Sequence, residues 1–334
     1  MIKAISVANA YASALGGSAA QAADLFCPDG VSWEARSELL RTNKQQIREY
    51  QDFAVQALGE VGGLNVTCTQ AILLPNGLVR MQSFSSGTVA GTCERIALTI
   101  DTNNDCIALA YGSAVPNDPE ALRQVDFENE MPWQNGTAVD TAGPSQNPQT
   151  SKGSCTPCDP VYSNDAGLTE EQVNRALDGA KAAWVSGLLE NNATSIADTY
   201  CENGNLWGTV TAMPRNTYPE IKSYFDWFAT SRNFTETILS TCPTITKIGN
   251  GVLVVSQELN LGGQCLRMQF TIVDQKDGEQ CVAALDSSYV PATPAELMGD
   301  ASNAGDKGDA APSGSVRISV LWGAVMTFMA YVMM

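Results

Sequence analysis

The sequence contains no histidine among its 334 residues. A Ser-His-Asp triad, a Cys-His dyad and a histidine-ligated catalytic zinc are therefore excluded. Any acid–base chemistry would fall to Asp, Glu, Tyr, Lys, Cys or water. We expect neither a metal nor a cofactor.

Basic side chains are also few, because 19 Lys and Arg residues stand against 36 Asp and Glu residues and give a net charge of −17. An acidic surface repels nucleic acid and anionic membrane surfaces, so neither is expected as a partner of the folded surface. The hydrophobic content of 44% is sufficient for a sizeable core. A chain of this length is long enough for two domains.

The cysteines reveal an internal repeat. Eight of the ten fall into two sets of four, and the second set follows the first at offsets of 172 to 175 residues: Cys27, Cys68, Cys93 and Cys106, then Cys201, Cys242, Cys265 and Cys281. Other residues recur in step, among them Trp33 with Trp207, Arg41 with Arg215, and Tyr50 with Tyr224. The sequence therefore predicts two copies of one domain, at 1–118 and 167–292.

Each repeat places helices before strands. In the second copy, Thr169-Glu-Glu-Gln172 is a capping box that begins a helix with an apolar stripe through Trp184 and Leu188. A short helix at about 192–200, a strand at 206–211 and a helix over 219–228 follow. Four strands are then expected at 239–247, 251–261, 265–274 and 281–290, with Asn250-Gly251 as a hairpin turn.

The four in-step cysteines of each repeat indicate two disulfides per domain and an oxidising compartment. N-glycosylation sequons at Asn65, Asn135, Asn192 and Asn233 agree with a secretory route and predict a glycoprotein. Free structural thiols in a cytosolic protein are the alternative. Four cysteines allow three pairings, and the sequence alone does not choose among them.

The segment 119–166 is rich in Asn, Gly, Pro, Ser and Thr and is predicted to be a flexible linker. It contains Cys155-Thr-Pro-Cys158, a spacing that in a reducing compartment would indicate a redox motif or half of a zinc site. No second free cysteine pair and no histidine accompany it. We therefore expect a local Cys155–Cys158 disulfide.

The two ends of the sequence bear on localisation. Residues 293–317 form a small, polar spacer, and 318–334 form an apolar tail, which together predict a glycosylphosphatidylinositol anchor attached at Asn303, with Ser302 and Gly305 as alternatives. A tail-anchored transmembrane helix is the competing interpretation.

Residues 1–23 resemble a weak secretory signal but align with the first helices of the second repeat, so a truncated start is expected. The expected location is the extracellular side of the cell surface.

The second repeat resembles a known superfamily. The residues that carry the resemblance are Trp184, Leu206-Trp207-Gly208-Thr209, Arg215, Ile221-x-x-Tyr224-Phe225-Asp226-x-Phe228, Arg267-x-x-Phe270-Thr271 and Ser287-Ser288-x-x-Pro291. They are similar to the nuclear transport factor 2-like superfamily, especially its polyketide-cyclase-like (SnoaL-like) members and the association domain of calcium/calmodulin-dependent kinase II. The first repeat matches more weakly.

The resemblance implies an α+β fold of two cone-shaped domains, each with helices packed on the concave face of a strongly bent, mixed six-stranded sheet. With this sheet order, we favour the pairings Cys27–Cys106, Cys68–Cys93, Cys201–Cys281 and Cys242–Cys265. Related proteins include dehydratases, isomerases, cyclases, oligomerisation modules and iota-type carbonic anhydrases, so the fold does not set the function. Related proteins often carry His-His-Ser-Ser in the last strand, where this chain has Leu285-Asp286-Ser287-Ser288 and Ala110-Tyr111-Gly112-Ser113.

The resemblance also implies a pocket between helices and sheet. Its candidate lining in the second repeat is Trp184, Tyr200, Trp207, Arg215, Trp227 and Gln269, and the candidate catalytic residues are Asp286, Tyr224, Arg267, Thr209 and Ser288. Asp286 would act as base, with Arg267 or Tyr224 orienting a substrate oxygen. Burial would raise the pKa of Asp286 and a nearby arginine would lower it. The alternatives are core packing for the tryptophans, a structural Arg267–Asp286 ion pair, and capping or salt-bridge roles for Arg41 and Arg215.

Two functions follow from these observations. The first is a surface module without metal that binds a small apolar ligand or self-associates through its sheets. The second is a metal-free lyase or isomerase, including a carbon dioxide hydratase similar to iota-type carbonic anhydrase. Matching polar pockets in the two repeats would favour the enzyme, and an apolar pocket would favour binding.

Overall fold

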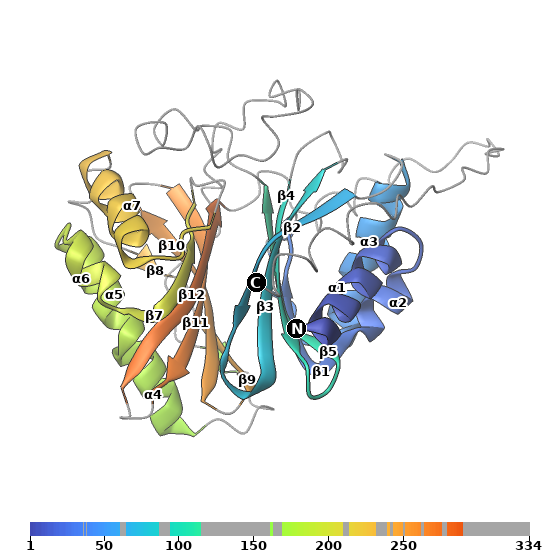
Figure 1. The fold of residues 1–334 in the computed structure, drawn as a ribbon, viewed down its shortest axis with the longest axis horizontal. Coiled ribbons are helices and arrows are strands. Elements are labelled where there is room, and N and C mark those ends of the chain that lie inside the picture. Colours follow the sequence, from blue (N-terminus) through green and yellow to red (C-terminus); the bar gives the residue numbers. More distant parts are fainter. Residues whose placement is uncertain are drawn as a thin grey trace, which may run out of the picture.

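Two sheets lie face to face at the centre of the computed structural model, and helices cover their outer faces (Figure 1). The structure describes residues 1–35, 37, 39–60, 65–86, 94–114, 161–162, 169–209, 214–231, 239–240, 243–249, 251–261, 264–275 and 279–289. The architecture is α+β, as the sequence predicts, with one helix-on-sheet domain for each repeat.

Domain 1 holds the first sheet. Its elements are α1 (Ile2–Leu15), α2 (Ala19–Asp24), β1 (Phe26–Trp33), α3 (Lys44–Glu60), β2 (Asn65–Leu73), η1 (Pro75–Gly77), β3 (Leu78–Ser86), β4 (Glu94–Asp101) and β5 (Cys106–Ala114). The strand order is β1-β5-β4-β3-β2. The sheet is mixed because β1 and β5 are parallel and the other neighbours are antiparallel.

Domain 2 repeats this plan. Its elements are β6 (Val161–Tyr162), α4 (Glu170–Asp178), α5 (Ala180–Leu189), α6 (Ala193–Ala197), β7 (Tyr200–Trp207), α7 (Tyr218–Ser231), β8 (Leu239–Ser240), β9 (Thr244–Gly249), β10 (Val252–Leu261), β11 (Gln264–Asp274) and β12 (Gln280–Tyr289). The order is β6-β9-β10-β11-β12-β7, and β8 pairs with β10. The described residues thus form five and seven strands, where six were expected in each domain; β6 and β8 are two-residue additions.

The predicted capping box is present, since the Thr169 side chain accepts from the Gln172 backbone and the Gln172 side chain accepts from the Thr169 backbone. The expected single helix is nevertheless two, α4 and α5. They meet at Gly179, where a Cβ would lie 2.4 Å from the Arg175 carbonyl oxygen. Residues 1–23 form α1 and most of α2, and their buried face packs into the core of domain 1.

Each sheet is buried on both faces. In each domain, one face of the sheet packs against the helices of that domain, so the chain has two separate apolar cores of this kind. The other face packs against the opposite sheet through a shared apolar cluster that includes Val31, Leu109, Val252, Val254 and Ala283. The sheet faces that were expected to associate with another molecule are thus covered by each other within the chain.

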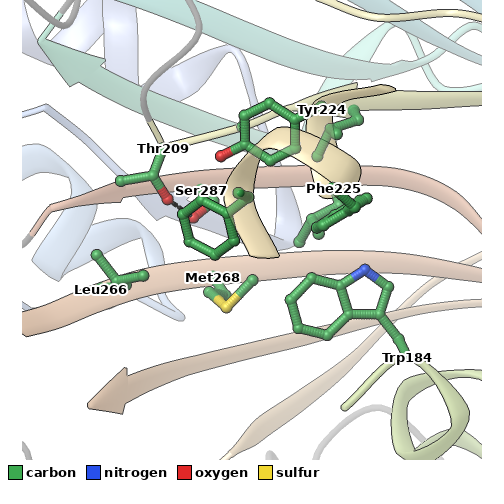
Figure 2. A pocket seen from close by; sticks show the side chains of 11 residues that line it. Trp184, Thr209, Tyr224, Phe225, Leu266, Met268 and Ser287 are labelled. Carbon is green, nitrogen blue, oxygen red and sulfur yellow. Dashed lines mark hydrogen bonds between the residues drawn. The ribbon is translucent and has the colours of Figure 1, made fainter. Parts of the chain in front are cut away.

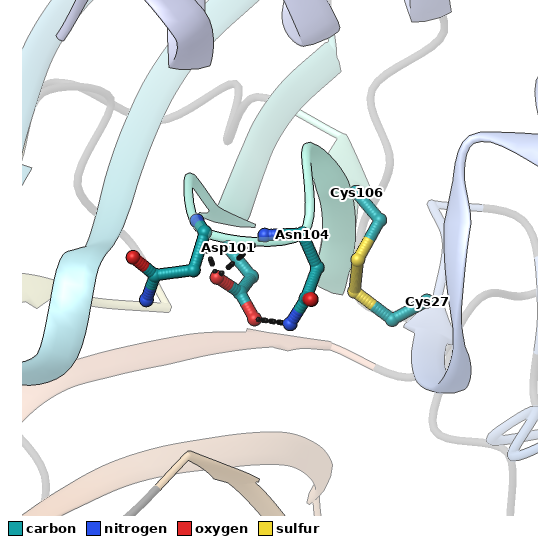
Figure 3. Close-up of a disulfide and its surroundings, with 5 residues drawn as sticks. Cys27, Asp101, Asn104 and Cys106 are labelled. Carbon is teal, nitrogen blue, oxygen red and sulfur yellow. Dashed lines mark hydrogen bonds between the residues drawn. A yellow bond between two sulfur atoms is a disulfide. The ribbon is translucent and has the colours of Figure 1, made fainter.

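Two of the five predicted disulfides are confirmed. Cys27–Cys106 joins β1 to β5, and Cys201–Cys281 joins β7 to β12 at the equivalent place. Figure 3 shows the first bond beside the turn in which the Asp101 carboxylate accepts from the Asn104 side chain. The pairs Cys68–Cys93, Cys242–Cys265 and Cys155–Cys158 lie outside the residues whose side chains are described.

Several predicted features also fall outside the described residues. They are the linker apart from β6, the sequons at Asn135 and Asn233, the Asn65 side chain, the anchor site at Asn303 and the tail 318–334. Within the described ranges, no helix combines the length and the apolar character needed to cross a bilayer.

Candidate functional site

A small cavity lies inside domain 2, between the helices and the sheet (Figure 2). Its volume is about 10 Å³, which is the space for roughly one water molecule. It is lined by Trp184, Leu206, Gly208, Thr209, Tyr224, Phe225, Phe228, Leu266, Met268, Leu285 and Ser287. The lining is therefore mainly aromatic and aliphatic.

Strand periodicity explains which side chains reach this cavity. Alternate residues of a strand point to the same face, so Leu266 and Met268 of β11 and Leu285 and Ser287 of β12 face the helices together. From the other side α7 supplies Tyr224, Phe225 and Phe228, and α5 supplies Trp184. The Trp184 ring makes edge contacts with Phe225 and Phe270, at 5.6 and 5.3 Å between centroids.

Polar character in the cavity comes from hydroxyl groups. Thr209 and Ser287 share a hydrogen bond between their side-chain oxygens (Figure 2). The Tyr224 ring packs over Gly208, where a Cβ would lie 2.5 Å from the ring. Among the described lining residues there is no Asp, Glu, Lys or Arg. The cavity therefore offers hydrogen bonds but no carboxylate or cation.

Three further pocket candidates lie near the cavity but do not line it. Tyr200 is buried in the same core, and burial raises the pKa of its hydroxyl well above the usual value. Trp227 is half-buried on α7 beside Tyr224. Arg215 lies over the Tyr224 ring at 5.8 Å and donates to the Glu220 carbonyl, so it fixes the start of α7.

The remaining candidates point the opposite way, toward domain 1. Trp207, Gln269, Arg267, Asp286 and Ser288 lie on the face of β7, β11 and β12 that is turned away from the helices of domain 2. A residue on the other strand face cannot share the cavity with Tyr224 and Thr209. The structure therefore separates Asp286 and Arg267 from Tyr224 and Thr209, which lie at the cavity on the other face of the sheet.

Asp286 forms a buried ion pair with Arg80 of domain 1. The two side chains are 1% and 0% exposed. Burial raises the pKa of the Asp286 carboxyl, and Arg80 opposes that rise. A structural ion pair for Asp286 was an expected alternative, but its partner is Arg80 rather than Arg267.

Arg267 binds backbone of domain 1. Its guanidinium donates to the carbonyl oxygens of Glu34 and Ser37, both at 2.8 Å, and of Gly112 at 2.9 Å. It also donates to the Ser288 hydroxyl, which in turn shares a hydrogen bond with Tyr111 at 2.8 Å. These contacts give Arg267 and Ser288 a role in joining the two domains.

Arg95 mirrors Arg267 from the other side. It donates to the Gly208 and Ser287 carbonyl oxygens of domain 2, at 2.7 and 2.8 Å, and to the Ser113 hydroxyl of its own domain. Its guanidinium lies 5.3 Å from the centre of the Trp207 ring. Burial lowers the pKa of Arg95 to about 10.

The interior of domain 1 contains a polar cluster that the sequence analysis missed. The Glu34 carboxylate accepts from the hydroxyls of Tyr11 at 2.9 Å and Ser32 at 3.0 Å, and the Gln51 amide donates to the Tyr11 oxygen at 3.0 Å. Glu34 is 6% exposed. Burial, opposed by the hydroxyl donors, raises the pKa of Glu34.

The repeat offset could have revealed this cluster. Ser32, Glu34 and Gln51 occupy the positions of Leu206, Gly208 and Phe225 in domain 2. The interior of domain 1 is thus polar where that of domain 2 is apolar. The two domains do not have matching pockets.

The described residues contain no group of three or more His, Cys, Asp or Glu side chains that could hold a metal ion. The cluster around Glu34 supplies one carboxylate with hydroxyl and amide neighbours. This donor set is unlike the several carboxylates or carbonyls that a calcium or magnesium site uses.

Fold and contacts together define the class: a tandem α+β protein whose two helix-covered sheets pair within one chain. No family model matches the sequence, and no curated protein matches it.

Solved structures of similar fold cover less than half of this chain. They include a calcium/calmodulin-dependent protein kinase II association domain of Xanthomonas campestris, with 21% identity, covering 41% of this chain and 98% of that one at a TM-score of 0.32. A ketosteroid isomerase-like protein of Erwinia carotovora has 13% identity, 36% and 98% coverage and a TM-score of 0.30. A nuclear transport factor 2-like protein of Pseudomonas putida has 9% identity, 36% and 89% coverage and a TM-score of 0.32. These are the classes that the sequence resembles, and scores at this level assign no function.

Proposed function

We propose that this protein is an extracellular module that binds a small apolar ligand in the cavity of domain 2, without a metal and without catalysis. The observation that carries the proposal is the lining of that cavity, where apolar and aromatic side chains surround one hydroxyl pair. Ligand pockets commonly combine such a lining with a few polar groups that orient the ligand.

Two further observations favour binding over proton transfer. The only acidic side chain among the proposed catalytic residues, Asp286, is paired with Arg80 on the far side of the sheet. The interiors of the two domains also differ, and a duplicated enzyme would be expected to keep one set of groups. Association through the sheet faces takes place within the chain.

The cavity volume limits the ligand. About 10 Å³ admits no ring unless side chains move. Helix α7 supplies Tyr224, Phe225 and Phe228, so we propose that a movement of this helix or of these rings enlarges the cavity. A ligand of one ring with a single hydroxyl or carbonyl suits the Thr209–Ser287 pair. We further propose that each sheet bends into the cone that the resemblance implies, which would close the cavity at its base.

Binding can be tested on the full chain with two probes of nearly equal shape, toluene and benzyl alcohol, titrated calorimetrically. We expect saturable binding of both, with benzyl alcohol the tighter. Thr209→Val keeps the shape and removes one hydroxyl, so it is expected to weaken benzyl alcohol binding by roughly 2- to 10-fold and leave toluene unchanged. Tyr218→Phe, on the exposed side of α7, is the control. Absence of saturable binding of either probe would refute the proposal.

The hydratase alternative is tested directly. Carbon dioxide hydration by the full chain is compared with that of Asp286→Asn and Thr209→Ala. We expect no rate above buffer for any of the three. A rate that is abolished by Thr209→Ala would establish the enzyme instead, because Thr209 lines the cavity and shares a hydrogen bond with Ser287.

We propose that the module is displayed on the extracellular side by a lipid anchor at Asn303, with glycans on Asn65, Asn135, Asn192 and Asn233. The confirmed disulfides are compatible with this location. Asn192 is exposed, and its Oδ1 accepts from the Ser195 backbone as the cap of α6. Glycosylation would use the other side-chain atom, Nδ2, so the cap and a glycan are compatible. Mass spectrometry of glycopeptides and of the C-terminal peptide tests each site.

A further inference from the structure

The contacts between the two sheets follow an approximate two-fold symmetry. Arg95 and Arg267 occupy equivalent positions, opposite Ser113 and Ser288 on the neighbouring strand. Each donates to backbone carbonyls of the other domain at equivalent places, Gly208 and Glu34. Reciprocal contacts of this kind characterise the interface of a symmetric homodimer. They would form equally well between two copies of the same domain.

One buried contact breaks the symmetry. Arg80 faces Thr99 on the next strand, and the residue at the same register in domain 2, opposite Thr271, is Val254. Asp286 pairs with Trp207 in register, and the residue that pairs with Trp33 in domain 1 is Tyr111. The image of the Arg80–Asp286 ion pair is therefore a Val254–Tyr111 pair, which carries no charge.

A neighbouring contact is asymmetric in the same sense. The side chains of Gln82 and Asn205 exchange two hydrogen bonds across the interface, at 2.7 and 3.2 Å. The equivalent residues in the other domains are Ser256 and Val31, by the same registers. Arg80, Gln82, Asn205 and Asp286 thus form a charged and strongly polar half of the interface. The equivalent residues in the other half, Val254, Ser256, Val31 and Tyr111, carry no charge.

This asymmetry destabilises both homotypic pairs, domain 1 with domain 1 and domain 2 with domain 2. Two domain 1 sheets in the observed geometry would place each Arg80 against a Tyr111, with no carboxylate. Two domain 2 sheets would place each Asp286 against a Val254, with no guanidinium. Both charged side chains are almost fully buried. A buried charge that loses its partner is far more costly than the pair is beneficial, so each homotypic pair carries two such penalties.

We propose that the Arg80–Asp286 pair, assisted by Gln82 and Asn205, makes the sheet face of domain 1 accept domain 2 and reject a second domain 1. The reciprocal arginines bring any two such sheets together, and the asymmetric pair selects the correct combination. Such discrimination by unpaired charge is a general route to specificity. It goes beyond the proposed ligand binding and does not depend on it.

The test uses the full chain with a protease site inserted in the segment 119–166. After folding and cleavage, neither confirmed disulfide joins the two halves, because each one lies within one domain. The interface between the sheets then holds the halves together. Cleaved protein is mixed with cleaved, isotope-labelled protein until the halves have exchanged, and native mass spectrometry counts the pairs. We expect mixed domain 1–domain 2 pairs to outnumber homotypic pairs by roughly 100-fold or more. A statistical mixture of all three pairs would overturn the proposal.

Two sets of variants sharpen the test. The double variant Arg80→Asp with Asp286→Arg keeps one pair of opposite charges, and its halves are expected to pair with each other but not with wild-type halves. The double variant Arg80→Val with Asp286→Tyr makes the two faces alike at the positions of the ion pair, and homotypic pairs are then expected to appear. The exposed pair Lys222→Asp with Asp226→Lys is the control and should exchange freely with wild type. Free mixing of the reversed and wild-type halves would also refute the proposal. The wild-type exchange decides alone if a variant does not fold.

Discussion

Arg267 of domain 2 lies over the indole ring of Trp33 in domain 1, with 5.4 Å between the guanidinium carbon and the ring centre. The same guanidinium donates to three carbonyl oxygens of domain 1, those of Glu34, Ser37 and Gly112. Arg267 is 0% exposed, so the contact is fully desolvated. It is one of the two equivalent arginines that tie the sheets together.

Substitution of Arg267 should therefore destabilise the whole chain rather than alter a pocket. Arg267→Met keeps much of the aliphatic bulk but removes the guanidinium donor from all three carbonyls, so we expect the free energy of unfolding to fall by about 3 kcal/mol or more. Denaturant unfolding followed by tryptophan fluorescence measures the loss. Arg48→Met, on the exposed face of α3, is the matched control and should lie within about 0.5 kcal/mol of wild type. A wild-type stability for Arg267→Met would contradict the assignment.

The alternation of strand faces explains why Arg267 and Asp286 face domain 1 and not the cavity of domain 2. The family resemblance implies a pocket between the helices and the sheet, and all the candidate residues were assigned to that pocket. Of the motif Leu285-Asp286-Ser287-Ser288, only Leu285 and Ser287 line the cavity. Here the second face is covered by the other repeat, a long-range contact that local patterns do not encode. Five of the eleven candidate residues therefore belong to the interface between the domains.

Other parts of the fold could be predicted from the sequence because they depend on local chemistry. The capping box at Thr169, the Gly251 turn with its positive φ and the in-step cysteines each identify an element through short-range constraints. The polar cluster of domain 1 was missed for a different reason. Glu34 stands where domain 2 has Gly208, so the motif of the second repeat contains no carboxylate at this position.

Glu34 provides a pH dependence with a defined sign. Burial raises its pKa in the folded state above the unfolded value near 4.5, so the folded protein binds the proton more tightly. Its contribution to stability is present at low pH and falls as the pH rises from about 4.5 through the raised value. Glu34→Gln should remove this slope and be more stable than wild type at neutral pH. Denaturant midpoints measured from pH 4.5 to 8 test this. Glu49→Gln, an exposed carboxylate on α3, should keep the wild-type slope. A slope unchanged in Glu34→Gln would exclude Glu34 as its source.

The two confirmed disulfides should make nearly equal contributions to stability. Their cysteines are 79 and 80 residues apart in the sequence, so the loops that they close in the unfolded chain are almost the same. We expect the pair Cys27→Ala with Cys106→Ala to lower the free energy of unfolding by about 4 kcal/mol, and Cys201→Ala with Cys281→Ala to do the same. Denaturant titration under oxidising conditions measures both. Equal stability of the oxidised wild type and either variant would show that the bond does not constrain the chain.

The contact of Gly208 with Tyr224 can be isolated by a double-mutant cycle. A Cβ at Gly208 would lie 2.5 Å from the Tyr224 ring, closer than real contacts allow, so Gly208→Ala must displace the ring. We expect it to cost about 1–3 kcal/mol, the usual effect of overpacking.

The same substitution should be nearly neutral once the ring is gone, because Glu34 shows that the equivalent position of domain 1 tolerates a full side chain. Gly208→Ala in a Tyr224→Ala background is therefore expected to lose less than about 0.5 kcal/mol relative to Tyr224→Ala. Additive losses in the cycle would mean that the backbone at Gly208, and not the aromatic wall of the cavity, requires glycine. Coupling would show that Tyr224 closes the cavity by contact with Gly208, and that a change at this one position can open it.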